Sequence, residues 1–192
     1  MSSSASSSLP SFPPWSIYYH ATYDSEWHAK SYKLLGSFTT FPEMWGALKR
    51  IETHFPHGMY FLMKGVPSAE VPGSDGPLAG PGREGPKWEK GHHAPLWEHK
   101  YNVHGGAYCI KVERDGLDVF QHYAAAAILG EITANPANPI IGVTISPKKG
   151  FYIMKLWNTS SDDFKDPRDI KLLPLSVKTS DILYRPHGDA RM

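Results

Sequence analysis

The sequence predicts an α+β fold, in which a mainly antiparallel sheet of about seven or eight strands carries about three helices on one face. Short runs rich in β-branched and aromatic residues recur along the chain, as expected of strands. Longer segments instead repeat apolar residues at helical spacing. Hairpins join some strand runs and helices interrupt others, without regular strand–helix–strand alternation, which favours an antiparallel sheet over a parallel one.

The first strands follow a serine- and proline-rich start. Residues 1–14 read MSSSASSSLPSFPP, which offers little apolar surface to bury and predicts a disordered tail. Strands are expected in WSIYYH from Trp15, in YKLLGSF at 32–38 and in MYFLMK at 59–64. Because the chain has 192 residues, residues 15–192 are expected to form a single domain with its own core.

A first helix is expected from about 41 to 54. Thr40 and Glu43 have the spacing of a capping box, and Pro42 suits the first helical turn. Apolar residues then follow at helical spacing: Trp45, Leu48, Ile51 and Phe55. By contrast, the stretch at about 66–95 is too rich in proline and glycine for a helix or a central strand. We expect it to be a long inserted loop beside a functional site.

The second half of the chain is again expected to contain both strands and a helix. Alternation of Tyr108, Ile110 and Val112 predicts a strand. A helix is expected next, capped by Asp115 and ended by Gly130. Its apolar face comprises Leu117, Phe120, Tyr123, Ala124, Ala127 and Ile128.

The C-terminal part predicts a hairpin, a short helix and a last strand. IIGVTIS and FYIMKLW, joined by PKKG, have the β-branched and aromatic content of a hairpin. DPRDIKLLPL, at 166–175, suggests a short helix, and DILYR, at 181–185, suggests the last strand.

Composition excludes several classes of function. The formal net charge of +1 gives no broad basic surface for duplex DNA. The chain has no run of about 18 apolar residues and no signal-peptide pattern at its start, so we expect no membrane association and a cytoplasmic location. A single cysteine, Cys109, excludes an internal disulfide.

The sequence also gives no indication of an enzyme or of a metalloprotein. His92, His93 and His99 form the densest histidine cluster, but they lack the spacing of zinc ligands. Cys109 lies in an apolar strand pattern, and no GxSxG, P-loop or GxGxxG motif occurs. We therefore expect no catalytic residue, no bound metal and no cofactor.

Two aromatic–charged pairs have more than one interpretation. Trp97 directly before Glu98 fits either a half-buried ring beside a solvated carboxylate or part of a binding site. Lys155 and Trp157 lie two residues apart in a strand, so both point to one face about 7 Å apart. They could hold an anion beside a flat ring, or the lysine could extend past a tryptophan of the core.

The order of the tryptophans resembles that of the messenger-RNA cap-binding family, translation initiation factor 4E. The similarity runs from about residue 15 to residue 189 and rests on Trp15, Trp27, Trp45, Trp97 with Glu98, and Trp157. SFTTFPEMW resembles the entry into the family's first helix, and AAAAILGE the end of its second. The resemblance implies a curved antiparallel sheet with the helices on its convex face.

By that resemblance, Trp27 and Trp97 sandwich the 7-methylguanine base of the cap. The Glu98 carboxylate accepts hydrogen bonds from guanine N1 and N2, the backbone amide of Trp97 donates to O6, and Trp157 packs against the N7-methyl group. Methylation makes the base cationic, which adds cation–π attraction to stacking. A carboxylate facing two donors selects guanine over adenine, because adenine has an acceptor at N1.

The resemblance also assigns a phosphate-binding role to basic residues near Trp157. Lys148 matches the first basic residue that the family commonly offers, whereas Ile153 and Ala107 fall where further basic residues are expected. Lys149 or Lys155 would have to compensate. Lys155 is favoured, because strand alternation places it on the same face as Trp157.

Trp45 takes the position that receives helical peptides on the convex face, together with Tyr123 and Gly130. The implied partners are capped messenger RNA, including hypermethylated caps, and a scaffold protein of the initiation factor 4G type or a 4E-binding protein. The neighbouring helix offers His122, Tyr123 and Ala126 where the family has large apolar and acidic contacts. A paralogue that represses or sequesters messenger RNA with unusual partners is therefore an alternative.

Two interpretations from other classes stay open at the level of sequence. A reader of methylated lysine also surrounds a methylated cation with aromatic rings and an acid. A carbohydrate-binding module uses tryptophan platforms, but it does not call for Glu98 beside a ring.

Overall fold

The protein is described here by a computed structural model covering residues 11–65, 95–113, 115–174 and 177–188. Most of the predicted tail, 1–14, and almost all of the predicted loop at 66–95 lie outside these residues. The described chain forms one seven-stranded antiparallel sheet in the order β2-β1-β3-β5-β6-β4-β7. The strands are β1 (Trp15–Ala21), β2 (Lys33–Phe38), β3 (Gly58–Lys64), β4 (Gly106–Val112), β5 (Gly142–Lys148), β6 (Phe151–Asn158) and β7 (Leu183–Pro186).

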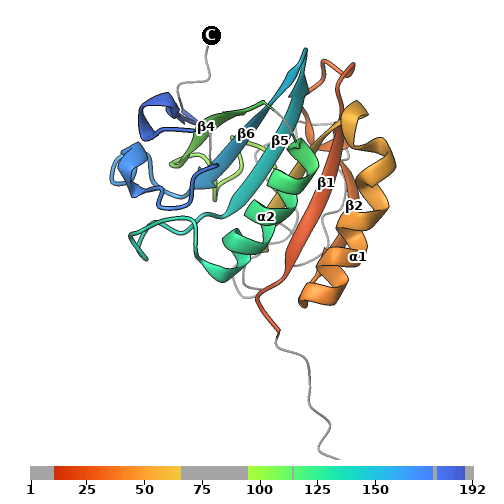
Figure 1. Ribbon diagram of the computed structural model, residues 1–192, viewed down its shortest axis with the longest axis horizontal. Coiled ribbons are helices and arrows are strands. Elements are labelled where there is room, and N and C mark those ends of the chain that lie inside the picture. The colour runs from red at the N-terminus through yellow and green to blue at the C-terminus, as the bar shows by residue number, and fades with distance from the viewer. Residues whose placement is uncertain (1–10, 66–94, 114, 175–176, 189–192) are drawn as a thin grey trace, which may run out of the picture.

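Two helices, α1 (Phe41–Ile51) and α2 (Gly116–Leu129), lie side by side on one face of the sheet (Figure 1). The α+β fold class is thus confirmed, with the sheet curved and its convex face carrying the helices. The predicted strands and the hairpin between β5 and β6 are confirmed as well.

The capping box at the start of α1 is confirmed, but the helix ends earlier than predicted. The Glu43 carboxylate accepts hydrogen bonds from the backbone amides of Thr39 at 2.9 Å and Thr40 at 3.1 Å. The chain beyond Ile51 tightens into a 3-10 helix, Glu52–His57, in place of the α-helix expected to residue 54. Pro56 explains the change, because proline has no N–H to donate and disfavours α-helical geometry in the residue before it.

Gly130 ends α2 as predicted, with a left-handed backbone at φ 71°. The prediction that Asp115 caps the helix with its side chain is wrong. Asp115 occupies the N-cap position, but its backbone is left-handed, at φ 53°, and its side chain makes no capping hydrogen bond. An N-cap residue usually has an extended backbone, which is what brings its side chain to the free amides of the first turn.

The short helix predicted at 166–175 is a single 3-10 turn, Pro167–Asp169. Residues 170–172, after this turn, instead pair through their backbone with residues 132–133, which come just after α2 in the chain. Ile170 forms a bridge with Thr133, and the amide of Lys171 donates to the carbonyl of Ile132 at 3.0 Å. These bonds to a neighbouring segment replace those of the expected helix.

Buried side chains form two clusters, one on each face of the sheet. The larger cluster fills the space between the sheet and the helices. The concave cluster lies on the opposite face; its buried members are Tyr18, Ala29, Tyr32, Met59, Phe61, Met63, Leu96, Ala107, Ile141 and Trp157. Six of these ten residues are aromatic or methionine, so the concave face is rich in flat or adaptable surfaces.

A buried polar network ties β4, β6 and β7 together around Asn158, which is inaccessible to solvent. Its side-chain oxygen accepts from the amide of Gly106 at 3.1 Å and from the hydroxyl of Tyr184 at 2.9 Å. Its amide group donates to the side-chain oxygen of Asn138 at 3.2 Å and to the carbonyl of Phe164. The network therefore fixes three strands beside Trp157.

Asn158→Ala is predicted to lower the free energy of unfolding by about 2–4 kcal/mol, because it leaves several buried polar groups without partners. Urea unfolding followed by circular dichroism measures the loss. Thr159→Ala, at the exposed neighbouring position, is the control. Equal losses in the two variants would show that the network contributes little.

Candidate functional site

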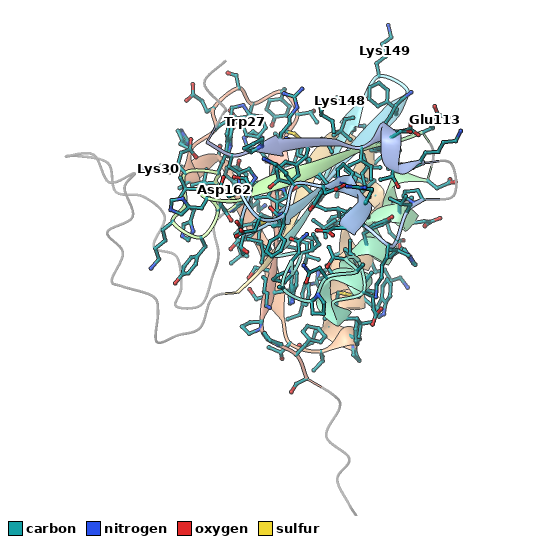
Figure 2. All side chains as sticks on the ribbon, turned by 90° about the vertical axis from the view of Figure 1, so that its left-hand side faces the viewer. Trp27, Lys30, Glu113, Lys148, Lys149 and Asp162 are labelled. Atoms are coloured by element: carbon teal, nitrogen blue, oxygen red, sulfur yellow. The ribbon has the colours of Figure 1, made fainter. Side chains whose placement is uncertain are left out.

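Trp27 lies between β1 and β2 and is 46% exposed (Figure 2). One face of its indole stacks on the imidazole of His20, with ring centroids 4.3 Å apart and planes inclined by 7°. Tyr32, just before β2, meets the His20 ring edge-on at 5.0 Å. Trp27 is thus supported by buried rings while a large part of its own surface stays open to solvent.

Trp97 and Glu98 lie on the loop that leads into β4. Asn102, which is fully buried, organises this loop. Its side-chain amide donates to the carbonyl of Leu96, and its backbone amide donates to the carbonyl of His99 at 2.7 Å. Trp97 packs half-buried against the concave cluster, and Glu98 is exposed.

Tyr32 links the segments that carry the two tryptophans. Its burial raises the pKa of the Tyr32 hydroxyl, and the nearby Glu98 carboxylate raises this pKa further. Tyr32 belongs to the concave cluster, against which Trp97 packs, and its ring centroid lies 6.4 Å from that of Trp27. The structure therefore brings the predicted base-binding residues to one region of the concave face.

Trp157 lies in the same cluster, on β6, and is almost completely buried. Its neighbours across the sheet are small: Gly142 on β5 and Ala107 on β4. These neighbours leave room for an indole to lie on the sheet. His187 covers the indole, with ring centroids 4.6 Å apart.

Two cations lie on the concave face next to Trp157. Lys155 is opposite Cys109 across β4, and Arg185 on β7 is opposite Ala107. Burial raises the pKa of the Cys109 thiol, while the positive charges of Lys155 and Arg185 both lower it, so both cations lie near this thiol. Strand alternation alone predicts Lys155 on this face, whereas the position of Arg185 depends on the pairing of β4 with β7 and was not predicted.

The other predicted phosphate-binding residues lie at the far end of the hairpin. Lys148 and Lys149 are exposed at the turn between β5 and β6, and Lys149 projects away from the protein (Figure 2). Ile153 lies between this turn and Lys155 along β6. The hairpin lysines are thus separated from Trp157 by most of the length of β6.

Three buried polar atoms around Lys155 have no hydrogen-bond partner among the described residues: Thr144 Oγ1, Trp157 Nε1 and His187 Nε2. Thr144 pairs with Lys155 across the sheet, and Trp157 follows it by two residues. Such unpaired buried groups are uncommon in folded proteins. Their clustering beside a cation indicates a place where a polar ligand could supply the missing bonds.

On the convex face, the structure separates the predicted partner-binding residues. Trp45 on α1 is 45% exposed, and Gly130 is exposed at the end of α2. Tyr123, however, is 1% exposed, and its hydroxyl donates to the carbonyl of Leu172 at 2.8 Å. Its assignment as a partner contact is wrong, because its ring faces the core; its neighbour His122 is exposed.

Among the residues that the structure describes, those weighed for other chemistry do not gather into a site. No group of three or more potential metal ligands occurs in the described part of the chain. His99 stacks on Tyr101, with centroids 5.5 Å apart, while His92 and His93 lie outside the described residues. Among the described helices, none is long and apolar enough to cross a membrane.

The curved sheet with helices on its convex face is similar to solved structures of cap-binding initiation factors. A structure of C. elegans eIF4E-3 with the 4E-binding protein Mextli and a cap analogue is 18% identical, with 94% of each chain covered and a TM-score of 0.62. Ascaris suum eIF4E-3 with an m2,2,7G cap is 19% identical, with 81% of this chain and 77% of that chain covered and a TM-score of 0.55. A schistosome eIF4E with m7GpppA and 4E-BP is 16% identical, with 81% of this chain and 74% of that chain covered and a TM-score of 0.53.

These identities establish a shared fold, and sequence establishes the family. The sequence model of the family described as Eukaryotic initiation factor 4E matches residues 88–191, more than half of the chain. The protein therefore belongs to the eukaryotic initiation factor 4E family. A sequence search of curated proteins found no match.

Stability is predicted to depend on pH through His187. Burial lowers the pKa of His187, and the charge of Lys155 lowers it further, while the hydrogen bond to the Asn102 carbonyl acts in the opposite direction. Below about pH 6.5 the unfolded chain therefore binds more protons at this residue than the folded chain, and stability falls as the pH falls.

Urea unfolding at about pH 7 and about pH 5.5 measures this loss. His187→Asn should show a smaller loss than the wild type, whereas His54→Asn, at an exposed position, should behave like the wild type. The pKa of His99 is also lowered by burial, so part of the pH dependence should persist in His187→Asn. An unchanged dependence in that variant would contradict the assignment.

Proposed function

We propose that the protein binds the 7-methylguanosine cap of messenger RNA on its concave face, with the base stacked between Trp27 and Trp97. The observation that carries the proposal is the exposure of Trp27 together with its packing on His20. A ring as large as indole is half exposed, yet it is held in a fixed plane by the buried ring of His20. Such a ring is a platform for stacking. Structures similar in fold hold an m2,2,7G cap and a cap analogue.

The chemistry of the site suits a methylated purine. Stacking on an aromatic side chain contributes roughly 1–3 kcal/mol per base, and the positive charge of 7-methylguanine adds cation–π attraction. The exposed Glu98, next to Trp97, can accept from the N1 and N2 donors of guanine. Trp157, buried within the same cluster, forms the apolar wall for the methyl group.

The phosphates of the cap are assigned to Lys155 and Arg185. Both cations lie beside Trp157 on the concave face, flanking Ala107 and Cys109. The unpaired indole N–H of Trp157 can donate to a phosphate oxygen. Lys148 and Lys149, at the hairpin turn, would reach only later phosphates or the following nucleotide.

Membership of the initiation factor 4E family supports the proposed biological role. The protein acts in translation initiation or its regulation, in the cytoplasm, and without catalysis. A scaffold protein or a 4E-binding protein would contact the exposed Trp45 and the end of α2, where Ala125, Ala126 and Leu129 line a shallow hollow of about 440 Å³. Solved relatives in fold carry 4E-binding proteins, namely Mextli and 4E-BP. Repression through an unusual partner is the variant of this role that the altered α2 surface favours.

Trp27→Ala and Trp97→Ala are each predicted to abolish retention on a 7-methyl-GTP resin, because one side of the sandwich is lost. Trp45→Ala is a matched control, since Trp45 is as exposed as Trp27 but lies on the convex face. Circular dichroism checks that all three variants fold. Retention of both site variants at the level of Trp45→Ala would refute the sandwich. A change in tryptophan fluorescence on titration with a trimethyl-lysine peptide, but not on titration with 7-methyl-GTP, would instead indicate a methyl-lysine reader.

Lys155→Ala and Arg185→Ala are predicted to weaken binding of 7-methyl-GTP by roughly tenfold each, while changing the affinity for 7-methylguanosine much less, because the nucleoside has no phosphate. Calorimetric titration measures both ligands. Lys49→Ala, on the exposed side of α1, is the control for a lost positive charge. Equal losses for nucleoside and nucleotide would point to a packing role for the cations.

A further inference from the structure

Thr144 on β5 carries a hydroxyl group that the fold leaves without a hydrogen bond. The residue is 2% exposed, and its Oγ1 atom has no partner among the residues that the structure describes. A buried hydroxyl normally makes at least one hydrogen bond, and leaving it unpaired is costly. Valine would fill nearly the same space without that cost, so the hydroxyl itself calls for an explanation.

The pairing of the strands places Thr144 on the concave face. It lies opposite Lys155 on β6 and opposite Phe61 on β3, which belongs to the concave cluster. Trp157 follows Lys155 by two residues, so its side chain lies on the same face, about 7 Å further along β6. The indole N–H of Trp157 is also buried and unpaired. Two neutral hydrogen-bond donors thus adjoin one cation on the concave face.

The chemistry of these three groups suits an anionic oxygen. The ammonium group of Lys155 and the indole N–H of Trp157 can only donate hydrogen bonds, and the hydroxyl of Thr144 can donate as well. A phosphate oxygen accepts several hydrogen bonds at once, and its negative charge strengthens each of them. The residues paired with the three groups on neighbouring strands carry no carboxylate that would repel an anion: Phe61, Gly142, Ala107 and Cys109.

We propose that Thr144 is a specificity-determining residue of the cap site, and that its hydroxyl donates to the phosphate attached directly to the nucleoside. Lys155 and the indole N–H of Trp157 bind the same phosphate. The first phosphate fits because Trp157 packs against the base, whereas Lys148 lies four residues beyond Thr144 along β5, about 13 Å away. The inference rests on the proposed function for the identity of the nucleotide.

Lys155 gives the ligand access to the hydroxyl. Side chains directly opposite each other on antiparallel strands have their Cβ atoms about 5 Å apart, so the stem of Lys155 lies beside Thr144. Lys155 is partly exposed, and its four-carbon stem is flexible. When its ammonium group turns toward a phosphate, the stem moves with it and the hydroxyl beside it becomes available to the same ligand.

Thr144→Val tests the contact, because it keeps the shape of the side chain and removes the hydroxyl. The affinities for 7-methyl-GMP and 7-methyl-GTP should each fall roughly fivefold to tenfold, while the affinity for 7-methylguanosine should not change. Calorimetric titration measures all three ligands. Ser146→Ala is the matched control, since it removes a hydroxyl from the same face of β5, two residues further from Trp157, and should leave all three affinities unchanged.

The same titrations can overturn the proposal in three ways. Nucleotide affinities of Thr144→Val equal to those of the wild type would show that the hydroxyl does not touch the ligand. An equal loss for the nucleoside would move the contact away from the phosphate. A loss confined to 7-methyl-GTP would place the contact at a later phosphate.

Stability distinguishes a ligand contact from a structural role. Because the hydroxyl of Thr144 has no partner in the protein, Thr144→Val should keep or raise the urea midpoint of the ligand-free chain. Thr133→Val is the opposite case and should lower the midpoint, since its hydroxyl donates to the carbonyl of Asn138 at 2.8 Å. A clearly lower midpoint for Thr144→Val would reveal a structural partner and overturn the proposal.

Inorganic pyrophosphate separates this inference from the proposed function. In the full chain with ¹⁵N-labelled tryptophan, pyrophosphate alone should shift the indole N–H signal of Trp157, and Thr144→Val should need a several-fold higher concentration for the same shift. If the wild type responds in this way but does not bind 7-methyl-GTP, the proposed function fails and the phosphate contact of Thr144 stands. If it responds to neither ligand, both fail. If it binds 7-methyl-GTP, the calorimetric series decides.

Discussion

The register of β6, β4 and β7 is the constraint on which the concave face depends. Side chains alternate between the two faces of a sheet, so a shift by one residue would move Trp157, Lys155 and Arg185 away from the site. The buried bonds of Asn158 oppose such a shift, because its side chain joins β4 to β7 at the position next to Trp157. The buried polar network thus fixes the positions of the aromatic and cationic side chains on the concave face.

The strands and the start of α1 could be predicted because their signals are local. Alternation of apolar residues and the Thr40–Glu43 capping box depend only on neighbours in the chain. The segment at 166–175 was predicted wrongly because a pattern compatible with a helix is overridden by backbone bonds to residues 132–134, which are distant in sequence. The left-handed backbone of Asp115 has no signal in residue type that distinguishes it from an ordinary capping aspartate.

The candidate site shows the same division between local and long-range information. Trp27, Trp97 and Trp157 could be proposed from their order in the sequence, and the structure brings them to one face of the sheet. Arg185 could be found only from strand pairing, because its importance lies in being opposite Ala107, where a basic residue was expected. The support of Trp27 by His20 depends on the stacking of two rings, which leaves no trace in sequence pattern.

The central claim is that two indoles enclose a cationic base, and one measurement tests it directly. The protein would be titrated with 7-methyl-GTP whose N7-methyl carbon is ¹³C-labelled, and the methyl resonance followed by nuclear magnetic resonance. The account predicts a strong upfield shift from the ring currents of the flanking indoles, with nuclear Overhauser contacts from the base and its methyl group to indole protons of Trp27, Trp97 and Trp157. A bound methyl group that keeps its solution shift, or that contacts none of these rings, would contradict the account.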